Sequence, residues 1–178
     1  MCIRDSLISL ASIQYDDGTS SGSIPASKVS IVENYDTSSV LGAKIGYGTG
    51  KNDIILFNRN DSASMSAAGV TTNAKEVSLL GIENSVITEG FGASDVSTLT
   101  YANGTLIESA SKVSVTADYR SSGVMTYVVS ADSAQTVKVY AGTAPAGITV
   151  NGVSATFTME GDLAVLSLAK GQSTIVIQ

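Results

Sequence analysis

Short runs of β-branched and aromatic residues, separated by turn-forming residues, dominate the second half of this chain. Val124–Ser130 and Thr136–Tyr140 are two such runs, with Gly, Pro, Asn and Asp between them and those that follow. This pattern is typical of antiparallel strands joined by tight turns. The stretch from Val124 to Ile177 therefore predicts a meander of short strands. Its remaining runs are Ile148–Gly152, Ala155–Thr158, Leu163–Leu168 and Thr174–Ile177.

The first half of the chain repeats the pattern. Lys28–Val32 and Val40–Tyr47 alternate like strands, and the continuous apolar run Ile54–Phe57 predicts a central strand covered on both faces. Ala102-Asn103-Gly104 predicts a type I′ hairpin turn, because Asn and Gly tolerate positive φ. A turn is also expected at 69–73. Further strands are predicted at Ser64–Ala68, Val77–Leu80, Ser85–Thr88, Ser97–Tyr101, Thr105–Glu108 and Lys112–Ala117.

No stretch keeps a convincing helical period. Ala67–Leu80 is the best candidate, but Gly69, Thr71 and Thr72 interrupt it. The sequence therefore predicts an all-β fold, an antiparallel β-sandwich, which is either one large two-sheet sandwich or two smaller sheet units packed together. Truncating Phe57 or Phe157 to Ala is expected to cost about 3 to 5 kcal/mol if both are core residues. The predicted core contains Leu56, Phe57, Tyr127, Val139, Phe157, Leu166 and Ile175.

The chain divides into four stretches by composition. Residues 1–6, Met1–Ser6, look like the translation of a sequencing adapter, which would make this a metagenomic fragment, and they are set aside. Residues 7–27 predict a strand remnant, Leu7–Tyr15, followed by a polar linker. Residues 28–118 are expected to form the main part of the sandwich, and residues 119–178 a C-terminal meander that completes or follows it. Cys2 is the only cysteine, so an intrachain disulfide is impossible.

Composition excludes several classes of function. The 178 residues include no histidine, so there is no Ser-His-Asp or Cys-His catalytic pair and no histidine-bearing zinc site. A net charge of −6 without any basic cluster gives no footprint for nucleic acid. No run reaches the roughly eighteen apolar residues of a membrane span. The chain alone is therefore not expected to be an enzyme.

Two kinds of binding site are compatible with the sequence. Tyr35, Tyr47 and Phe91 are candidates for an exposed aromatic surface that contacts carbohydrate, with ordinary core or rim packing as the alternative. No cofactor is expected. Loop oxygens suffice for calcium, although solvated loop acids explain the same residues. The candidate calcium ligands are Asp16 and Asp17, or Asn58, Asn60 and Asp61.

A small glycosidase is a more distant alternative. It would need two carboxyl groups held about 5 to 10 Å apart, with the pKa of one of them raised. The sequence permits such a pair but does not show one, because its acids are scattered. They are Glu83, Glu89, Asp95, Glu108, Asp118, Glu160 and Asp162.

The C-terminal runs carry a family resemblance. They look like the closing β-sandwich of bacterial polysaccharide-degrading enzymes, and most resemble the C-terminal β-sheet domain of heparinase II/III-like lyases. Asp53–Phe57 is also similar to the D-x-[VI]-L-F strand of that domain. The segments that carry the resemblance are Asp118-Tyr119, Val124–Val129, Val137–Tyr140, Pro145, Ile148–Gly152, Leu163–Leu168, Lys170-Gly171 and Ile175–Ile177.

The resemblance implies a trailing fragment of a secreted or periplasmic bacterial lyase. In such lyases the catalytic residues lie mostly on a preceding α/α-toroid, so no catalytic residue is assigned here. The implied partners are that missing N-terminal catalytic domain and a polysaccharide.

Two main hypotheses follow. The first is a noncatalytic accessory sandwich of a carbohydrate-active enzyme, with a supporting role and possible carbohydrate contact. The alternative is an Ig-like structural or adhesion module of a bacterial surface protein, which the composition rich in Ser, Thr, Gly and Ala fits about equally well.

Overall fold

A computed structural model describes residues 29–48, 50–60, 63–143 and 145–178. The expected strand at Leu7–Tyr15 and the stretches 1–6 and 7–27 lie outside these residues. All regular elements of the described part are strands, which confirms the predicted all-β antiparallel fold. In the same part, no helix is long and apolar enough to cross a membrane.

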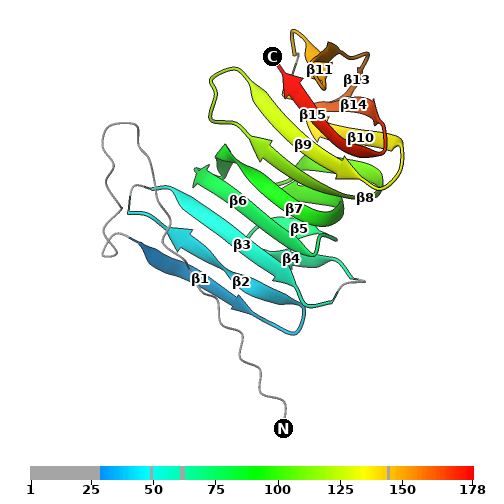
Figure 1. Cartoon of the computed structure of the whole chain (residues 1–178). Helices are drawn as coiled ribbons and strands as arrows, with labels where there is room; N and C mark the ends of the chain where they lie inside the picture. Colours follow the sequence, from blue (N-terminus) through cyan, green and yellow to red (C-terminus); the bar gives the residue numbers. More distant parts are fainter. Residues whose placement is uncertain (1–28, 49, 61–62, 144) are drawn as a thin grey trace.

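Fifteen strands follow one another through the described chain (Figure 1). The first eight are β1 (Ser30–Asp36), β2 (Val40–Gly46), β3 (Asn52–Asn58), β4 (Met65–Ala67), β5 (Val70–Thr72), β6 (Glu76–Glu83), β7 (Val86–Tyr101) and β8 (Gly104–Asp118). The others are β9 (Met125–Ala131), β10 (Gln135–Tyr140), β11 (Ile148–Val150), β12 (Val153–Ser154), β13 (Thr158–Glu160), β14 (Leu163–Leu168) and β15 (Gly171–Ile177).

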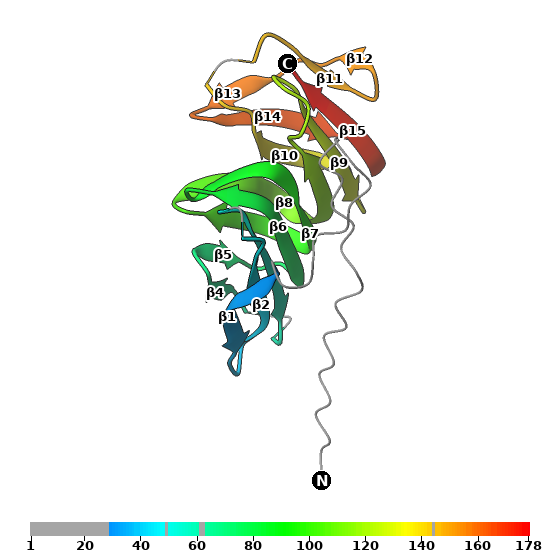
Figure 2. The same cartoon turned by 90° about the vertical axis from the view of Figure 1, so that its left-hand side faces the viewer.

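The strands form two layers that share β7 and β8. The front layer has the order β1-β2-β3-β6-β7-β8-β9-β15-β11-β12, and the back layer has the order β4-β5-β7-β8-β10-β14-β13. All pairings are antiparallel. Figure 2 shows the layers edge-on, with β4, β5, β13 and β14 on one side and β9 and β15 on the other. The result is a single large two-layer sandwich.

The long hairpin of β7 and β8 connects the two layers. The first part of β7 pairs with β6 in the front layer, and its last residues pair with β5 in the back layer. β8 pairs with β10 through 107–109 and with β9 through 113–118. The sequence pattern predicts four separate strands here. The chain instead bends within each strand, at Asp95 with a φ of 52° in β7 and between the two paired parts of β8.

One hydrophobic core fills the space between the layers. Leu56, Leu79, Tyr127 and Ile175 contribute to it from the front layer, and Leu166 contributes from the back layer. The strands after residue 118 pair with β8 and belong to this same core. The strands after residue 118 thus share one core with the strands from β2 onward.

The prediction that Phe57 lies in the core is wrong. Strand β3 alternates, so that Ile54, Leu56 and Asn58 are buried on its inner face, while Ile55 and Phe57 are half-buried on the outer face. A continuous apolar run hides this alternation, because its two faces have the same residue type. The expected cost of about 3 to 5 kcal/mol for truncation therefore does not apply to Phe57.

The other predicted core residues are placed inside the sandwich to different degrees. Tyr127, Val139 and the remaining aliphatic residues of the predicted set are fully buried. Phe157 is only partly buried, although its ring packs against the core. It precedes the three-residue strand β13 at the margin of the back layer, where fewer neighbours cover it.

The predicted hairpin between β7 and β8 is present, but its turn lies one residue earlier. Ala102 and Asn103 have φ values of 48° and 69°, because β7 ends at Tyr101 and β8 begins at Gly104. The turn expected at 69–73 is also displaced. It lies at Ala68 and Gly69, and the next three residues form β5. Cross-strand packing decides these registers.

Candidate functional site

A hydrogen-bonded polar cluster lies at one end of β2, β3 and β6. Tyr47 directly follows β2, and its hydroxyl donates to the Oδ2 of Asp53 in β3. The backbone N–H of Gly81 donates to the Oδ1 of Asp53 at 2.8 Å. Both carboxylate oxygens of Asp53 are thus hydrogen-bonded, one to the turn after β2 and the other to β6.

The position that hydrogen-bonds to Asp53 from β6 requires a glycine, Gly81. It has a φ of 65° at the irregularity between Leu80 and Ile82. A Cβ on Gly81 would lie 2.4 Å from the Cγ of Glu89. The glycine therefore admits both the left-handed backbone conformation and the close approach of the Glu89 side chain.

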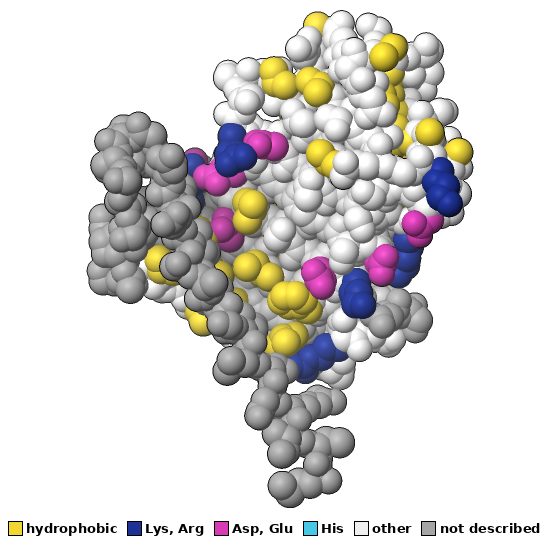
Figure 3. Space-filling model, in the orientation of Figure 1, with side chains coloured by type: hydrophobic (Ala, Val, Ile, Leu, Met, Phe, Trp, Pro, Cys, Tyr) yellow, Lys and Arg dark blue, Asp and Glu magenta, His cyan; other side chains and the backbone are white. Residues whose placement is uncertain are grey.

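Ion pairs surround this cluster. The Nζ of Lys51 lies 3.2 Å from Glu89 and 3.7 Å from Glu83. Arg120 pairs with Asp118 at 2.6 Å nearby, after β8. Figure 3 shows acidic and basic side chains gathered at the upper left margin of the front face. The partners are of opposite sign, and because these side chains are partly exposed to solvent, each pair adds little to stability.

Burial and charge shift the pKa values of this cluster in different directions. Burial raises the pKa of Asp53, although the hydrogen bonds from Tyr47 and Gly81 act against the rise. Burial also raises the pKa of the Tyr47 hydroxyl, and Asp53 adds to this rise. The exposed Asp118 behaves oppositely, because the hydrogen bond from Arg120 lowers its pKa to about 2.

Phe91, a candidate for carbohydrate contact, lies inside the sandwich. It is 2% exposed, and its ring meets Tyr119 and Tyr127 edge to face, with both centroid distances at 6.2 Å. The hydroxyls of Tyr119 and Tyr127 lie 2.8 Å apart, and the Tyr127 hydroxyl donates to the carbonyl of Tyr140 at 2.5 Å. In this arrangement Phe91 contributes packing between β7 and β9.

The three candidate aromatic residues do not share one surface. Tyr35 lies on the edge strand β1, where its ring packs against the main core and its hydroxyl donates to Glu33. Tyr47 is buried in the cluster with Asp53. The contact of these residues with carbohydrate stays a prediction, and any contact would use them separately.

The candidate calcium residues fall partly outside the described chain, where Asp16, Asp17 and Asp61 lie. The side chain of Asn58 stabilises the loop after β3. Its Nδ2 donates to the carbonyls of Ala63 and Ala74 at 2.8 and 3.2 Å, and its Oδ1 accepts from the N–H of Asn60 at 2.9 Å. Within the described ranges, no group of three or more Cys, Asp or Glu side chains is placed to hold a metal ion.

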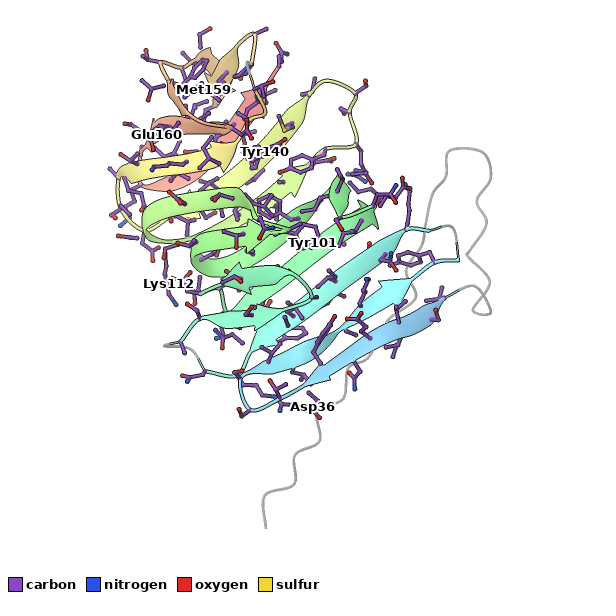
Figure 4. All side chains as sticks on the ribbon, turned by 180° about the vertical axis from the view of Figure 1, so that it is seen from behind. Asp36, Tyr101, Lys112, Tyr140, Met159 and Glu160 are labelled. Carbon is purple, nitrogen blue, oxygen red and sulfur yellow. The ribbon has the colours of Figure 1, made fainter. Side chains whose placement is uncertain are left out.

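The back layer has a charge cluster of its own. Lys138 of β10 lies 3.3 Å from Glu108 of the neighbouring strand β8 and 2.6 Å from Glu160 of β13, which lies on the far side of β14. Figure 4 shows Glu160 and Tyr140 on this side of the molecule. These glutamates, both named among the scattered acids, therefore pair with a base here.

An open trough runs across the outer face of the front layer, and we call it the outer trough. Its volume is about 430 Å³, and Ile55 and Phe57 of β3 form its apolar end. Residues of the neighbouring strands, both polar and apolar, line the rest of it. The polar residues and the glycine are Glu76 and Ser78 of β6, Gly92 and Ser94 of β7, Ser114 and Thr116 of β8, Ser130 of β9 and Gln172 of β15, and the apolar ones are Val77, Ala93, Val115 and Val128.

Two features shape the floor of the outer trough. Gly92 has no side chain, and a Cβ there would lie 3.0 Å from the Oγ of Ser78. The Oγ of Ser94 is buried and has no hydrogen-bond partner among the residues that the structure describes. This site is not among those that the sequence predicts. Its only signal is small polar residues at the outward positions of adjacent strands, which is visible only once their register is known.

Comparisons with known proteins found no relative of this chain. No protein-family model matches the chain, and no curated protein matches it significantly.

Proposed function

We propose that this chain is a noncatalytic β-sandwich accessory domain, the C-terminal part of a secreted bacterial polysaccharide-degrading enzyme. It supports the neighbouring domain and contributes contact with the polysaccharide. A single observation carries the noncatalytic part of this proposal. The acids that come together in the cluster beside Tyr47, Asp53 and Glu89, are both engaged in contacts within the chain.

The bonding of these two acids fits a supporting role. A glycosidase acid must present its proton to a substrate oxygen, and its partner must face the same sugar. Asp53 instead accepts bonds from Tyr47 and Gly81, and Glu89 pairs with Lys51. The sequence also has no imidazole to replace them as acid or base.

The outer edge of the front layer supports the docking of a neighbouring domain. Ile31 and Val32 are 60% and 51% exposed on the edge strand β1. Ile31 also lines an apolar hollow of about 100 Å³, together with Ala43, Ile45, Ile55 and Phe57. Adjacent exposed apolar side chains on an edge strand are costly in water, and a partner domain that covers them removes this cost.

Turnover assays test the noncatalytic proposal. The purified chain is incubated with alginate and a glycosaminoglycan, and the ultraviolet absorbance of an unsaturated uronate product is followed. Reducing ends are followed with neutral polysaccharides. We expect no product above a blank without protein. Product formation that Asp53→Asn or Glu89→Gln abolishes would contradict the proposal, because a contaminating enzyme would not respond to these substitutions.

The genomic sequence upstream of Leu7 tests the accessory role. We expect a region coding for a helical toroid in the same reading frame. Tandem β repeats in that region would instead assign the chain to a surface or adhesion protein.

A further inference from the structure

We propose that the outer trough binds one chain of a neutral polysaccharide. This inference deepens the proposed function and rests on it, because it names the ligand class and the surface that the accessory domain uses. The surface differs from the aromatic candidates of the sequence analysis. Three properties of the trough support the proposal: its charge, its hydroxyl groups and its apolar end.

The charge of the outer trough excludes the acidic polysaccharides. Glu76 is the only charged side chain among the described residues that line it. The whole chain has a net charge of −6. A uronate or sulfate group would meet repulsion there and no cation to pair with. In Figure 3 the charged side chains of this face gather toward its margins, and its middle is formed mostly by uncharged residues.

The hydroxyl groups of the trough match those of a sugar. Each Ser or Thr hydroxyl both donates and accepts, as a sugar hydroxyl does, so the two sets can pair without an imposed polarity. Ser114, Thr116 and Ser130 are exposed on adjacent strands. Ser94, opposite Glu76 in the register, has the buried Oγ that the described chain leaves without a partner. Because this Oγ is shielded from solvent, the exposed hydroxyls of Ser114, Thr116 and Ser130 are the ones that a sugar can reach.

The apolar end and the missing side chain at Gly92 give the trough its shape. Phe57 and Ile55 offer a half-buried apolar surface on which the C–H face of a sugar ring can pack. Between this end and the hydroxyl groups, the floor is open because residue 92 is glycine. A rigid sheet holds these groups without the entropy loss that a mobile loop would add on binding.

The test uses native gels that contain a soluble polysaccharide. Three neutral polymers are compared, a mixed-linkage β-glucan, a xylan and a galactomannan, with alginate as the acidic polymer. We expect at least one neutral polymer to retard the chain in a saturable way and alginate to leave its mobility unchanged. Retardation by none of the three neutral polymers, or by alginate alone, overturns the inference.

Substitutions locate the binding to the trough. Gly92→Val fills the floor of the trough, and we expect it to raise the apparent dissociation constant for the polysaccharide more than tenfold. Gly104→Val is the matched control. Like Gly92 it lies in the β7–β8 hairpin without a positive φ, but a Cβ there meets only the Tyr101 carbonyl at 3.5 Å, outside the trough. Equal retardation of both variants overturns the inference.

A second variant keeps the test valid if Gly92→Val does not fold. Ser114 is exposed, so Ser114→Glu places a carboxylate in the trough without disturbing the core. We expect it to lose retardation while the thermal midpoint stays near that of the wild type. Unchanged retardation overturns the inference. Turnover of a polysaccharide would instead contradict the proposed function, so the two failures are distinguishable.

Discussion

Asp53 and Asp118 show how two carboxylates near Glu89 acquire opposite pKa shifts. Burial dominates at Asp53 and raises its pKa, whereas the hydrogen bond from Arg120 dominates at Asp118 and lowers it. In the native state Asp53 therefore binds its proton more tightly than in the unfolded chain, and Asp118 binds it less tightly. Linkage converts this difference into opposite effects of pH on stability.

Asparagine substitutions at the two positions should reveal these signs. As the pH rises from 3.8 through the raised pKa of Asp53, the wild type should lose stability relative to Asp53→Asn. As the pH falls from 3.8 to about 2, the wild type should lose stability relative to Asp118→Asn. Urea unfolding at a series of pH values measures both differences. Slopes of the same sign for the two pairs would contradict the assignment.

Ala102 is strained by the turn in which it lies. Its φ of 48° is unfavourable for a residue with a Cβ, and the neighbouring Asn103 tolerates its own φ of 69° better. We expect Ala102→Gly to stabilise the chain by about 0.5 to 1 kcal/mol. Ala110→Gly, at an exposed site within β8, is the control and should destabilise it by a similar amount. Urea unfolding measures the free energy of unfolding of both variants. A loss of stability in both would refute the turn assignment.

At the level of elements, the bend of β7 is held by Asn73 from the connection between β5 and β6. The Oδ1 of Asn73 accepts from the N–H groups of Ser97 and Thr98 at 2.9 and 3.1 Å. Its Nδ2 donates to the Oγ of Ser97 at 2.6 Å. These bonds satisfy the backbone where the register of β7 against β8 shifts. A side chain thus replaces strand pairing where β7 passes between the layers.

Removing this side chain should weaken the bend. Asn73→Ala leaves two backbone N–H groups without their acceptor, so we expect a loss of about 1 to 3 kcal/mol in the free energy of unfolding. Asn34→Ala, on the exposed edge strand β1, should change it by less than about 0.5 kcal/mol. Hydrogen exchange of the Ser97 and Thr98 amides gives a local measurement. Protection of these amides that is equal in Asn73→Ala and the wild type would contradict the assignment.

At the level of the whole molecule, the shared strands make the two layers depend on each other. β7 and β8 each contribute to both layers, and the main core joins residues from Val40 to Ile177, apart from a small cluster of Ala43, Ile45 and Tyr47. We therefore expect that neither the region before residue 119 nor the region after it can bury its apolar face alone. The sandwich is therefore expected to unfold as one unit.

Thermal unfolding should accordingly show one transition. Circular dichroism and tyrosine fluorescence, which is usable because the chain has no tryptophan, should give the same midpoint. A chain cut after Asp118 should not fold, because β8 would lose β9 and β10. Two separated transitions, or a folded fragment ending at Asp118, would show instead that the C-terminal strands are an independent unit.

The sequence by itself determined the fold class and most strand positions, because alternation and turn residues act within a few neighbouring residues. It also shows that the chain has no histidine, and therefore no imidazole for acid–base chemistry. Tertiary structure decided the rest. The bends in β7 and β8, the outward side chain of Phe57, the bond between Asp53 and Gly81 and the outer trough all depend on which strands pair. That choice is made by packing between residues far apart in the chain, which no local pattern records.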